Sequence, residues 1–161
     1  YLRLIHLARK NIYIETPYFI PDEEICEALK IAARSGIDVK IIAPCKPDHP
    51  FVYWATYAYL GEMLEAGARC YAYENGFLHA KCMCVDGMVS CLGTANMDMR
   101  SFSLNFEVNA FMYDSASALK LKEVFLSDQK DAELLHLKSW SLRPWYQKVM
   151  ESVIRLFAPL L

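Results

Sequence analysis

Phe77–Asn96 reads FLHAKCMCVDGMVSCLGTAN, and this stretch gives the strongest indication of the fold. Polar and apolar residues alternate before the aspartate, which predicts a strand over Phe77–Val85. Side chains two residues apart on a strand share a face, so His79 and Lys81 are expected to point into the same space. Ala80, Cys82 and Cys84 are expected on the opposite face.

A tight hairpin turn is predicted at Asp86-Gly87, which lies between two runs rich in Val, Met and Cys. A type I′ turn needs a positive φ at both central positions, and this dipeptide adopts it readily. If these two residues form the turn, the numbers of facing residues sum to 173. Thr94 is then expected level with His79, and Asn96 beside Phe77.

Such a hairpin would gather a histidine, a lysine and amide donors around a space that fits a phosphate group. An imidazole with an ordinary pKa of about 6.5 can act as a nucleophile or as an acid near neutral pH. We therefore interpret the hairpin as half of a site that transfers a phosphodiester. Asp86 lies roughly 23 Å beyond His79 along an extended strand, so it is expected to shape the turn and to do no chemistry.

The order of these residues resembles the HKD signature of the phospholipase D superfamily. The matching residues are His79-x-Lys81, Asp86, Gly93-Thr94 and Asn96. Two further segments, Thr16–Asp22 and Asn96–Glu107, make the resemblance closest to the carboxy-terminal catalytic lobe of bacterial cardiolipin synthases. The resemblance implies an α/β fold, a phospholipase D-like lobe with a mixed sheet flanked by helices.

The resemblance also implies roles for the catalytic residues. His79 would be either the nucleophile that forms a phosphohistidine or the general acid that protonates the leaving alcohol. Lys81 would hold the non-bridging phosphate oxygens, and Thr94 and Asn96 would donate hydrogen bonds where negative charge grows. Together these groups could replace a metal, and no cofactor is implied.

Glu107 corresponds to the carboxylate that holds the far nitrogen of the histidine in this superfamily. It would fix the imidazole tautomer, and it is expected on a strand near Phe106–Tyr113. Asp86 and Gly93 belong to the motif as structural residues. Each residue alone is common on strand surfaces, so the assignment depends on the spacing of the set.

Composition favours a single compact lobe over residues 1–161, because 55% of the chain is hydrophobic and the mean hydropathy is +0.11. The six cysteines lack the spacing of a disulfide framework, so they are predicted to be reduced and buried. Cys82-x-Cys84 could suggest a metal site. Zinc sites usually have two intervening residues and need two more ligands, so a core position is favoured.

The remaining sequence alternates between helical and extended patterns. Helices are predicted at Leu2–Arg9, at Glu23–Arg34 after an N-cap at Asp22, at Phe51–Ala66, and beyond Ser115; strands are predicted at Ile12–Glu15, Asp38–Ala43 and Arg69–Tyr73. This order predicts a mixed sheet covered by helices.

Residues 144–157 are predicted to form a C-terminal amphipathic helix that begins after a proline. Its apolar face carries Trp145, Val149, Val153 and Leu156, with Lys148, Glu151 and Arg155 opposite. This face could dock on the core or on a second lobe, or it could touch a lipid surface. The sequence leaves these alternatives open.

The resemblance implies a substrate as well. It implies transfer of a phosphatidyl group from one phosphatidylglycerol to the hydroxyl of another, through a phosphohistidine, giving cardiolipin and glycerol. The residues do not exclude water as the acceptor, so a phospholipase D outcome stays open. A net charge of −2 without a basic run disfavours nucleic acid. A homodimeric nuclease or phosphodiesterase and a non-catalytic lobe that binds a membrane or partner remain as alternatives.

The chain carries one HKD copy, whereas the reaction needs two histidines. The second HKD lobe is expected upstream in a longer protein, or in the mate of a homodimer. The chain starts at Tyr1 without a methionine, and it has no apolar run of the ~18 residues that a membrane span needs. We therefore expect a fragment of an enzyme at the bacterial cell membrane, acting at the membrane surface. Its catalytic lobe is expected on the cytoplasmic side, with any transmembrane segments outside this chain.

Overall fold

The computed structural model describes residues 1–46 and 48–158, so the end of the expected lobe, 159–161, lies outside the described residues. The helices are α1 (Leu2–Leu7), α2 (Glu23–Arg34), α3 (Pro50–Glu65), α4 (Met99–Ser103), α5 (Ser115–Asp128), α6 (Leu137–Ser141) and α7 (Trp145–Arg155), with a 3-10 turn, η1, at Gln129–Asp131. The strands are β1 (Asn11–Glu15), β2 (Phe19–Ile20), β3 (Asp38–Pro44), β4 (Arg69–Tyr73), β5 (Cys82–Val85), β6 (Val89–Gly93), β7 (Met97–Asp98), β8 (Asn109–Met112) and β9 (Ala132–Leu134).

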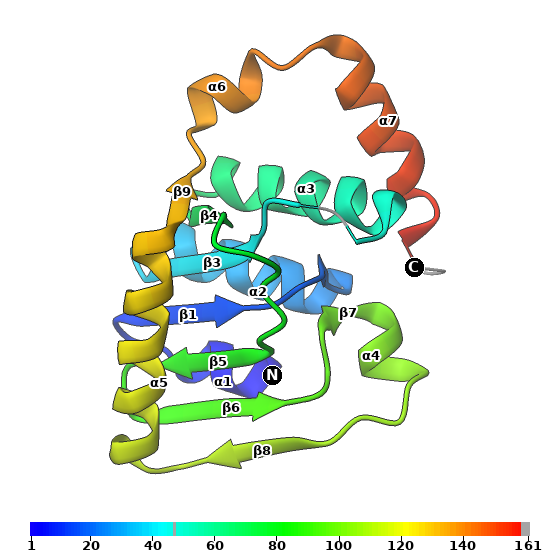
Figure 1. Ribbon diagram of the computed structural model, residues 1–161. Coiled ribbons are helices and arrows are strands. Elements are labelled where there is room, and N and C mark those ends of the chain that lie inside the picture. Colours follow the sequence, from blue (N-terminus) through cyan, green and yellow to red (C-terminus); the bar gives the residue numbers. More distant parts are fainter. Residues whose placement is uncertain (47, 159–161) are drawn as a thin grey trace.

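A seven-stranded mixed sheet runs through the described part of the chain in the order β8-β6-β5-β1-β3-β4-β9. Strands β1, β3 and β4 are parallel, and β5, β6, β8 and β9 are added in antiparallel pairs. The predicted α/β class with a mixed sheet between helices is therefore confirmed (Figure 1). A second, two-stranded sheet joins β2 to β7 in parallel.

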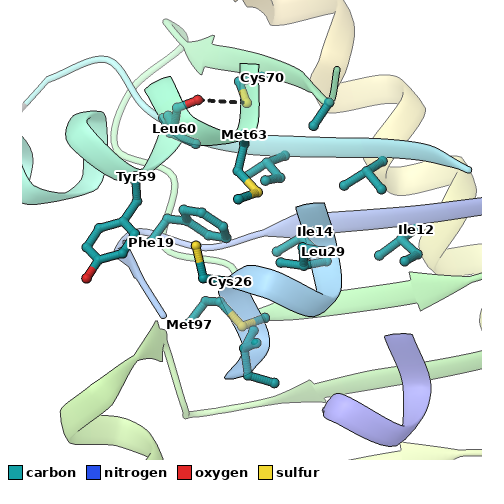
Figure 2. Close-up of a cluster of buried hydrophobic side chains, with 14 of the residues drawn as sticks. Ile12, Ile14, Phe19, Cys26, Leu29, Tyr59, Leu60, Met63, Cys70 and Met97 are labelled. Carbon is teal, nitrogen blue, oxygen red and sulfur yellow. Dashed lines mark hydrogen bonds between the residues drawn. The ribbon is translucent and has the colours of Figure 1, made fainter. Parts of the chain in front are cut away.

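Alternating side chains of the central strands supply two hydrophobic clusters. Ile12, Ile14 and Met83 belong to the larger cluster, together with residues of α2 and α3 such as Leu29 and Met63 (Figure 2). The intervening side chains face the other way, and a smaller cluster there joins Tyr13, Ile42 and Tyr71 to Phe125 of α5. The period of two along each strand thus explains why helices cover both faces of the sheet.

The carboxyl ends of β1 and β3 lie at one edge of the sheet, on the right in Figure 1. Antiparallel β6 also ends there, and β5 begins there. The segments that leave these strands therefore meet at one edge, and they include the segment between β4 and β5. Ligand sites in open α/β sheets commonly lie at such an edge.

The strand predicted over Phe77–Val85 is shorter than expected, because only Cys82–Val85 forms β5. Its partner β1 pairs from Ile12 to Glu15, and Glu15 faces Cys82. Beyond Glu15 the chain turns through Pro17, which has no backbone N–H to donate. Residues 77–81 therefore have no neighbouring strand on the β1 side, and they run as an irregular segment that only Lys81 ties to β6, through its carbonyl and the Gly93 N–H at 3.2 Å.

The predicted hairpin forms, but its register was wrong by one residue. Val85 faces Val89 and Cys82 faces Leu92, so the numbers of facing residues sum to 174. Asp86 and Gly87 have φ values of 55° and 64°, as a type I′ turn requires. Met88 donates its N–H to the Val85 carbonyl at 3.0 Å and closes the turn. It has no partner in β5, so it adds a third residue to the loop before Val89 pairs with Val85. Gly93 therefore lies level with Lys81, to whose carbonyl it donates its N–H at 3.2 Å, and the predicted pairing of Thr94 with His79 was wrong.

Candidate active site

His79 lies on the irregular segment between β4 and β5, with its side chain exposed at the edge where β1 ends. Its ring centroid lies 5.8 Å from that of Phe77. Lys81 is partly buried, and its Nζ donates a hydrogen bond to the His79 carbonyl at 3.1 Å. This bond ties the lysine to the backbone of the histidine. Within residues 1–46 and 48–158, no hydrogen bond engages the imidazole, which leaves it open to a substrate or another chain.

Two carboxylates act on the charge of Lys81. Burial lowers the pKa of Lys81 below its ordinary value, while the negative charges of Glu107 and Asp98 partly offset this effect. The influence of both carboxylates places them in the electrostatic neighbourhood of the lysine. Lys81 is therefore a cation influenced by two carboxylates, and it lies two residues from His79.

Gly93 and Thr94 fasten the end of β6 to the start of β8. A Cβ atom at Gly93 would lie 2.3 Å from the Val108 carbonyl oxygen and 2.1 Å from Asn109 Oδ1, so only glycine permits this approach. Thr94 donates its N–H to the Val108 carbonyl at 2.9 Å, and its Oγ1 accepts the Val108 N–H at 2.9 Å. The Thr94 hydroxyl is thus engaged with the backbone of the segment that follows Glu107. Its predicted role as a donor to substrate stays a prediction.

Asn96 lies directly before β7, at the junction of the two sheets. Its backbone N–H donates to Ser101 Oγ at 3.2 Å, and the Thr16 hydroxyl accepts the N–H of Met97 at 3.1 Å. The Asn96 Oδ1 is buried and has no hydrogen-bond partner among the described residues. Asn96 also lines a cavity of about 360 Å³. Its backbone is held by hydrogen bonds, while its side-chain oxygen is an unused acceptor.

Glu107 lies two residues before β8, whereas the sequence predicted a strand from Phe106 onwards. Its Oε1 accepts a hydrogen bond from Asn105 Nδ2 at 3.3 Å, and it borders a second cavity of about 470 Å³. Asn105 borders this cavity and the one beside Asn96, so Glu107 and Asn96 flank the same residue. No hydrogen bond joins Glu107 to His79 in residues 1–46 and 48–158, and the orienting role of Glu107 stays a prediction.

Asp86 stands at the far end of the hairpin and holds the segment before β1. Its carboxylate accepts the backbone N–H groups of Arg9 at 2.7 Å, Lys10 at 2.8 Å and Asn11 at 2.8 Å. Burial would raise the pKa of Asp86, but these three hydrogen bonds and the charge of Lys10 outweigh it and lower the pKa. Asp86 therefore fixes the backbone before β1, and it lies at the opposite end of β5 from His79.

Replacing Asp86 by asparagine is expected to lower the free energy of unfolding by about 2 kcal/mol at neutral pH, because charge-assisted hydrogen bonds are lost. Asparagine tolerates a positive φ, so the turn itself is kept. The folded pKa of Asp86 lies below the unfolded value of about 3.9, so its carboxylate stabilises the fold above that pH and loses this effect as the pH falls. Urea unfolding should show the difference between the two proteins shrinking below about pH 4. A difference that is constant with pH would contradict this account.

Sequence reasoning missed Glu15, a carboxylate buried at the end of β1. Cys82 Sγ donates to its Oε2 at 3.4 Å, while Oε1 has no partner among the described residues. Burial raises the pKa of Glu15 to about 7, because it outweighs the hydrogen bond from the Cys82 thiol, which lowers the pKa. A glutamate that ends an apolar strand was a visible signal in the sequence, because charged residues are rarely buried without a reason.

The prediction of reduced, buried cysteines is largely confirmed. All six cysteines are free thiols, and Cys45 alone among them is partly exposed. Cys84 Sγ donates to the Ala118 carbonyl of α5 at 3.1 Å, and Cys82 contacts Glu15 as described above. Both thiols of the Cys82-x-Cys84 pair are therefore buried in the core under α5.

Comparison with known proteins identifies the family of the chain that carries His79, Lys81 and Asn96. The model of a family described as "Cardiolipin synthase, PLD-like domain" matches residues 1–129. The chain belongs to this family. The resemblance to the phospholipase D superfamily, and to its cardiolipin synthases in particular, is thereby confirmed.

Curated members with the name cardiolipin synthase align with this PLD-like domain from end to end. Cardiolipin synthase 1 of Staphylococcus epidermidis is 47% identical over 161 residues, which cover 100% of this chain and 33% of that protein. The cardiolipin synthase of Listeria monocytogenes is 50% identical over the same length and coverage. The chain thus spans about a third of the length of these relatives.

Solved structures share the fold of this PLD-like domain. The phospholipase D family member Nuc from Salmonella typhimurium superposes with a TM-score of 0.73 at 21% identity, over 84% of this chain and 88% of its own. The phosphatidylserine synthase of Haemophilus influenzae superposes with a TM-score of 0.74 at 19% identity, over 99% of this chain and 41% of its own. At these identities the comparison establishes the fold of the domain.

Proposed function

We propose that this chain is one lobe of an enzyme that transfers a phosphatidyl group between two phosphatidylglycerol molecules. The products are cardiolipin and glycerol. The observation that carries this proposal is the open imidazole of His79, a residue whose backbone carbonyl accepts a hydrogen bond from Lys81 at the edge that also holds Glu107 and Asn96. Cardiolipin synthases of 47% and 50% identity support the choice of substrate.

The reaction would proceed by two displacements at phosphorus. One histidine attacks the donor, a P–N bond forms, and the P–O bond to glycerol breaks while a second histidine protonates the leaving oxygen. A hydroxyl of the acceptor phosphatidylglycerol then attacks phosphorus, gives its proton to the second histidine, and breaks the P–N bond. His79 is one of the two histidines. Lys81 balances charge on the non-bridging oxygens in both steps, and the Asn96 amide holds one of them.

The second histidine is proposed to come from another HKD lobe. Elsewhere in the described chain, His6 lies on α1, His136 precedes α6, and His49 borders the cavity beside Asn96. His136-x-Lys138 repeats the His-x-Lys spacing, but Arg143 stands where the signature has its aspartate, so none of the three histidines repeats the full signature. The threefold greater length of the relatives supports a lobe in the same longer protein, and a twofold homodimer is the alternative. The exposed apolar side chains of Leu104, Phe106 and Val108, which flank Glu107, suit such a partner.

Contact with a membrane surface is the second part of the proposal, because the proposed substrates reside in bilayers. Among residues 1–46 and 48–158, no helix has the length and apolarity to cross a bilayer. Helix α7 instead presents an exposed apolar row, in which Trp145 is 76% and Leu156 79% exposed, while Ile154 and Glu151 are buried against the core. Figure 1 shows α7 on the side of the molecule at which β1 ends. We place the lobe at the cytoplasmic face of a bacterial cell membrane.

Replacing Trp145 and Val149 together by serine is expected to weaken binding to phosphatidylglycerol vesicles at least about ten-fold. Each large apolar side chain that enters the interface contributes roughly 1.5–3 kcal/mol. Both residues are exposed, so folding should be unaffected. Co-sedimentation measures the binding, and Ile31→Ser, at an exposed apolar residue of α2, serves as the matched control. Equal loss in both variants, or none, would show that α7 does not bind the vesicles.

The proposed function is tested with vesicles of phosphatidylglycerol labelled in the phosphatidyl and glycerol parts, using the enzyme that contains both lobes. Cardiolipin and free glycerol in equal amounts are expected. Phosphatidic acid in place of cardiolipin would assign the activity to a phospholipase D. Cleavage of DNA by a dimer of this chain would favour the nuclease alternative, and the absence of any turnover would favour a non-catalytic lobe. Light scattering on the same samples gives the number of lobes per particle.

A further inference from the structure

A cavity of about 360 Å³ lies beside the proposed catalytic residues and has no role in the reaction as described so far. It is lined by Tyr18, His49, Val52, Asn96, Asp98, Arg100 and Asn105. These residues come from the segment after β1, the first turn of α3 and the residue before it, and the chain around β7 and α4. The cavity therefore lies at the same edge as His79, and Asn96 forms part of its wall.

Arg100 distinguishes this cavity from the others near the site. Its side chain is exposed and forms no ion pair or hydrogen bond within residues 1–46 and 48–158. Elsewhere, Arg69, Arg143 and Arg155 each pair with a carboxylate. A guanidinium without a partner beside a cavity offers paired donors, a geometry that matches the oxygens of a phosphodiester.

The acidic residues at this cavity are already engaged. Asp98 is buried and accepts the N–H of Ser101 at 2.6 Å as the N-cap of α4. Asp48, next to His49, accepts the hydroxyl of Tyr18. The imidazole of His49 forms no hydrogen bond in the described part of the chain, so it is a second free polar group there. The cavity thus offers Arg100, a cation without an ion pair, and His49, an imidazole without a hydrogen bond that lies near enough to Asp48 to help lower the pKa of that carboxyl.

Asn96 adds an acceptor to these donors. Its Oδ1 is buried, borders the cavity through its side chain, and has no donor among the described residues. Buried acceptors without a donor are costly, and a hydroxyl group of a ligand would satisfy this one once the amide turns toward the cavity. A ligand that carries both a hydroxyl and an anionic group is therefore the best match to the cavity.

The proposed reaction supplies such a ligand, because the acceptor is itself an anionic phosphodiester with a free hydroxyl. Six single bonds separate the phosphorus atoms that the new glycerol bridge joins, a reach of about 7 Å. An enzyme that links two phosphodiesters must hold the phosphate of the acceptor within this distance of the phosphate of the donor. Water or free glycerol as acceptor makes no such demand.

We propose that this cavity binds the glycerol phosphodiester headgroup of the acceptor phospholipid, with Arg100 as the partner of its phosphate. His49 is a second donor to the same group, and Asn96 receives the glycerol hydroxyl that does not attack. The proposal rests on the proposed function and deepens it, since it assigns the acceptor half of the site. Arg100 then selects a phospholipid over water or a simple alcohol as the acceptor.

The test compares two acceptors in the two-lobed enzyme. Phosphatidylglycerol as acceptor gives cardiolipin, whereas labelled glycerol exchanges into phosphatidylglycerol and uses the donor half of the site alone. Arg100→Gln is expected to reduce cardiolipin formation at least about ten-fold, with most of the loss recovered at high phosphatidylglycerol concentration. Glycerol exchange should change by no more than about two-fold. Arg100→Lys should fall between, because lysine keeps the charge and loses the paired donors.

Arg34→Gln, at an exposed arginine near the end of α2, is the matched control and should leave both reactions unchanged. Equal losses of both reactions in Arg100→Gln would overturn the acceptor site, and so would unchanged cardiolipin formation. The unsubstituted enzyme separates this outcome from failure of the proposed function. If that enzyme supports neither reaction, the proposed function is wrong, and the acceptor site is rejected with it.

Discussion

Replacing His79 by alanine lowers the expected rate of phosphatidyl transfer by about 10⁴-fold or more. Loss of a nucleophile, or of the acid that pairs with it, removes a covalent or proton-transfer step that no neighbouring group supplies. The imidazole is exposed and forms no hydrogen bond in the described part of the chain, so the substitution should leave the fold intact. Cardiolipin formation from labelled phosphatidylglycerol measures the effect, and circular dichroism checks the fold.

His136→Ala is the matched control for this variant. His136 is exposed before α6, outside the edge that carries His79, and its loss should leave the rate within about two-fold. A rate in the His79 variant that stays within ten-fold of the unsubstituted enzyme would remove this residue from the chemistry.

The same variant can assign the role of His79. Phosphatidyl-p-nitrophenol releases nitrophenolate, a leaving group that needs no proton from the enzyme. If His79 is the general acid, His79→Ala should still release a burst of nitrophenolate and form the covalent adduct on the other histidine. If His79 is the nucleophile, neither the burst nor the adduct should form. Either result decides between the two roles that the sequence leaves open.

Replacing Lys81 by methionine is expected to lower the rate about 10²- to 10³-fold, which corresponds to roughly 2.7–4 kcal/mol of lost transition-state stabilisation. Methionine keeps an unbranched side chain and removes the charge. Burial already lowers the pKa of Lys81, and the charge of Glu107 opposes this effect. Glu107→Gln should therefore move the alkaline limb of the pH–rate profile to lower pH, since Lys81 would lose its proton more easily.

Lys120→Met, at an exposed lysine of α5, tests whether removal of any positive charge has the same result. It should leave both the rate and the pH profile unchanged. Recovery of most of the lost activity in Lys81→Arg would indicate that charge alone suffices at this position. We expect only partial recovery, because the guanidinium is larger and planar.

Local sequence signals predicted the parts of the fold that depend on local chemistry. The hairpin at Asp86-Gly87 forms because both residues accept a positive φ. Helix α2 begins where Asp22 caps the N–H of Ile25 at 2.8 Å, and it ends before Gly36 with a φ of 88°. The spacing of His79, Lys81 and Asn96 pointed to one edge because a hairpin must return its ends together.

The parts that failed depend on neighbours that are distant in the sequence. Residues 77–81 could not be a strand once β1 ended at Glu15, and nothing within 77–81 itself reveals that end. The register shifted because Met88 stays outside the pairing, which a two-residue turn rule does not foresee. The cavity beside Arg100 joins three separated segments, so no local pattern could indicate it. The outward face of α7 likewise depends on which side of the helix meets α3.

Strand β8 forms one margin of the large sheet, since it pairs with β6 and with no other strand in the described chain. Its outer backbone groups, together with exposed Phe106 and Val108 just before it, form a template for pairing with another chain. The isolated lobe is therefore expected to self-associate through β8 as its concentration rises. In the longer protein, a neighbouring lobe that covers this margin would prevent the association. A particle mass that keeps rising with protein concentration would indicate open-ended association through this margin. A plateau at two copies would indicate a closed, symmetric dimer.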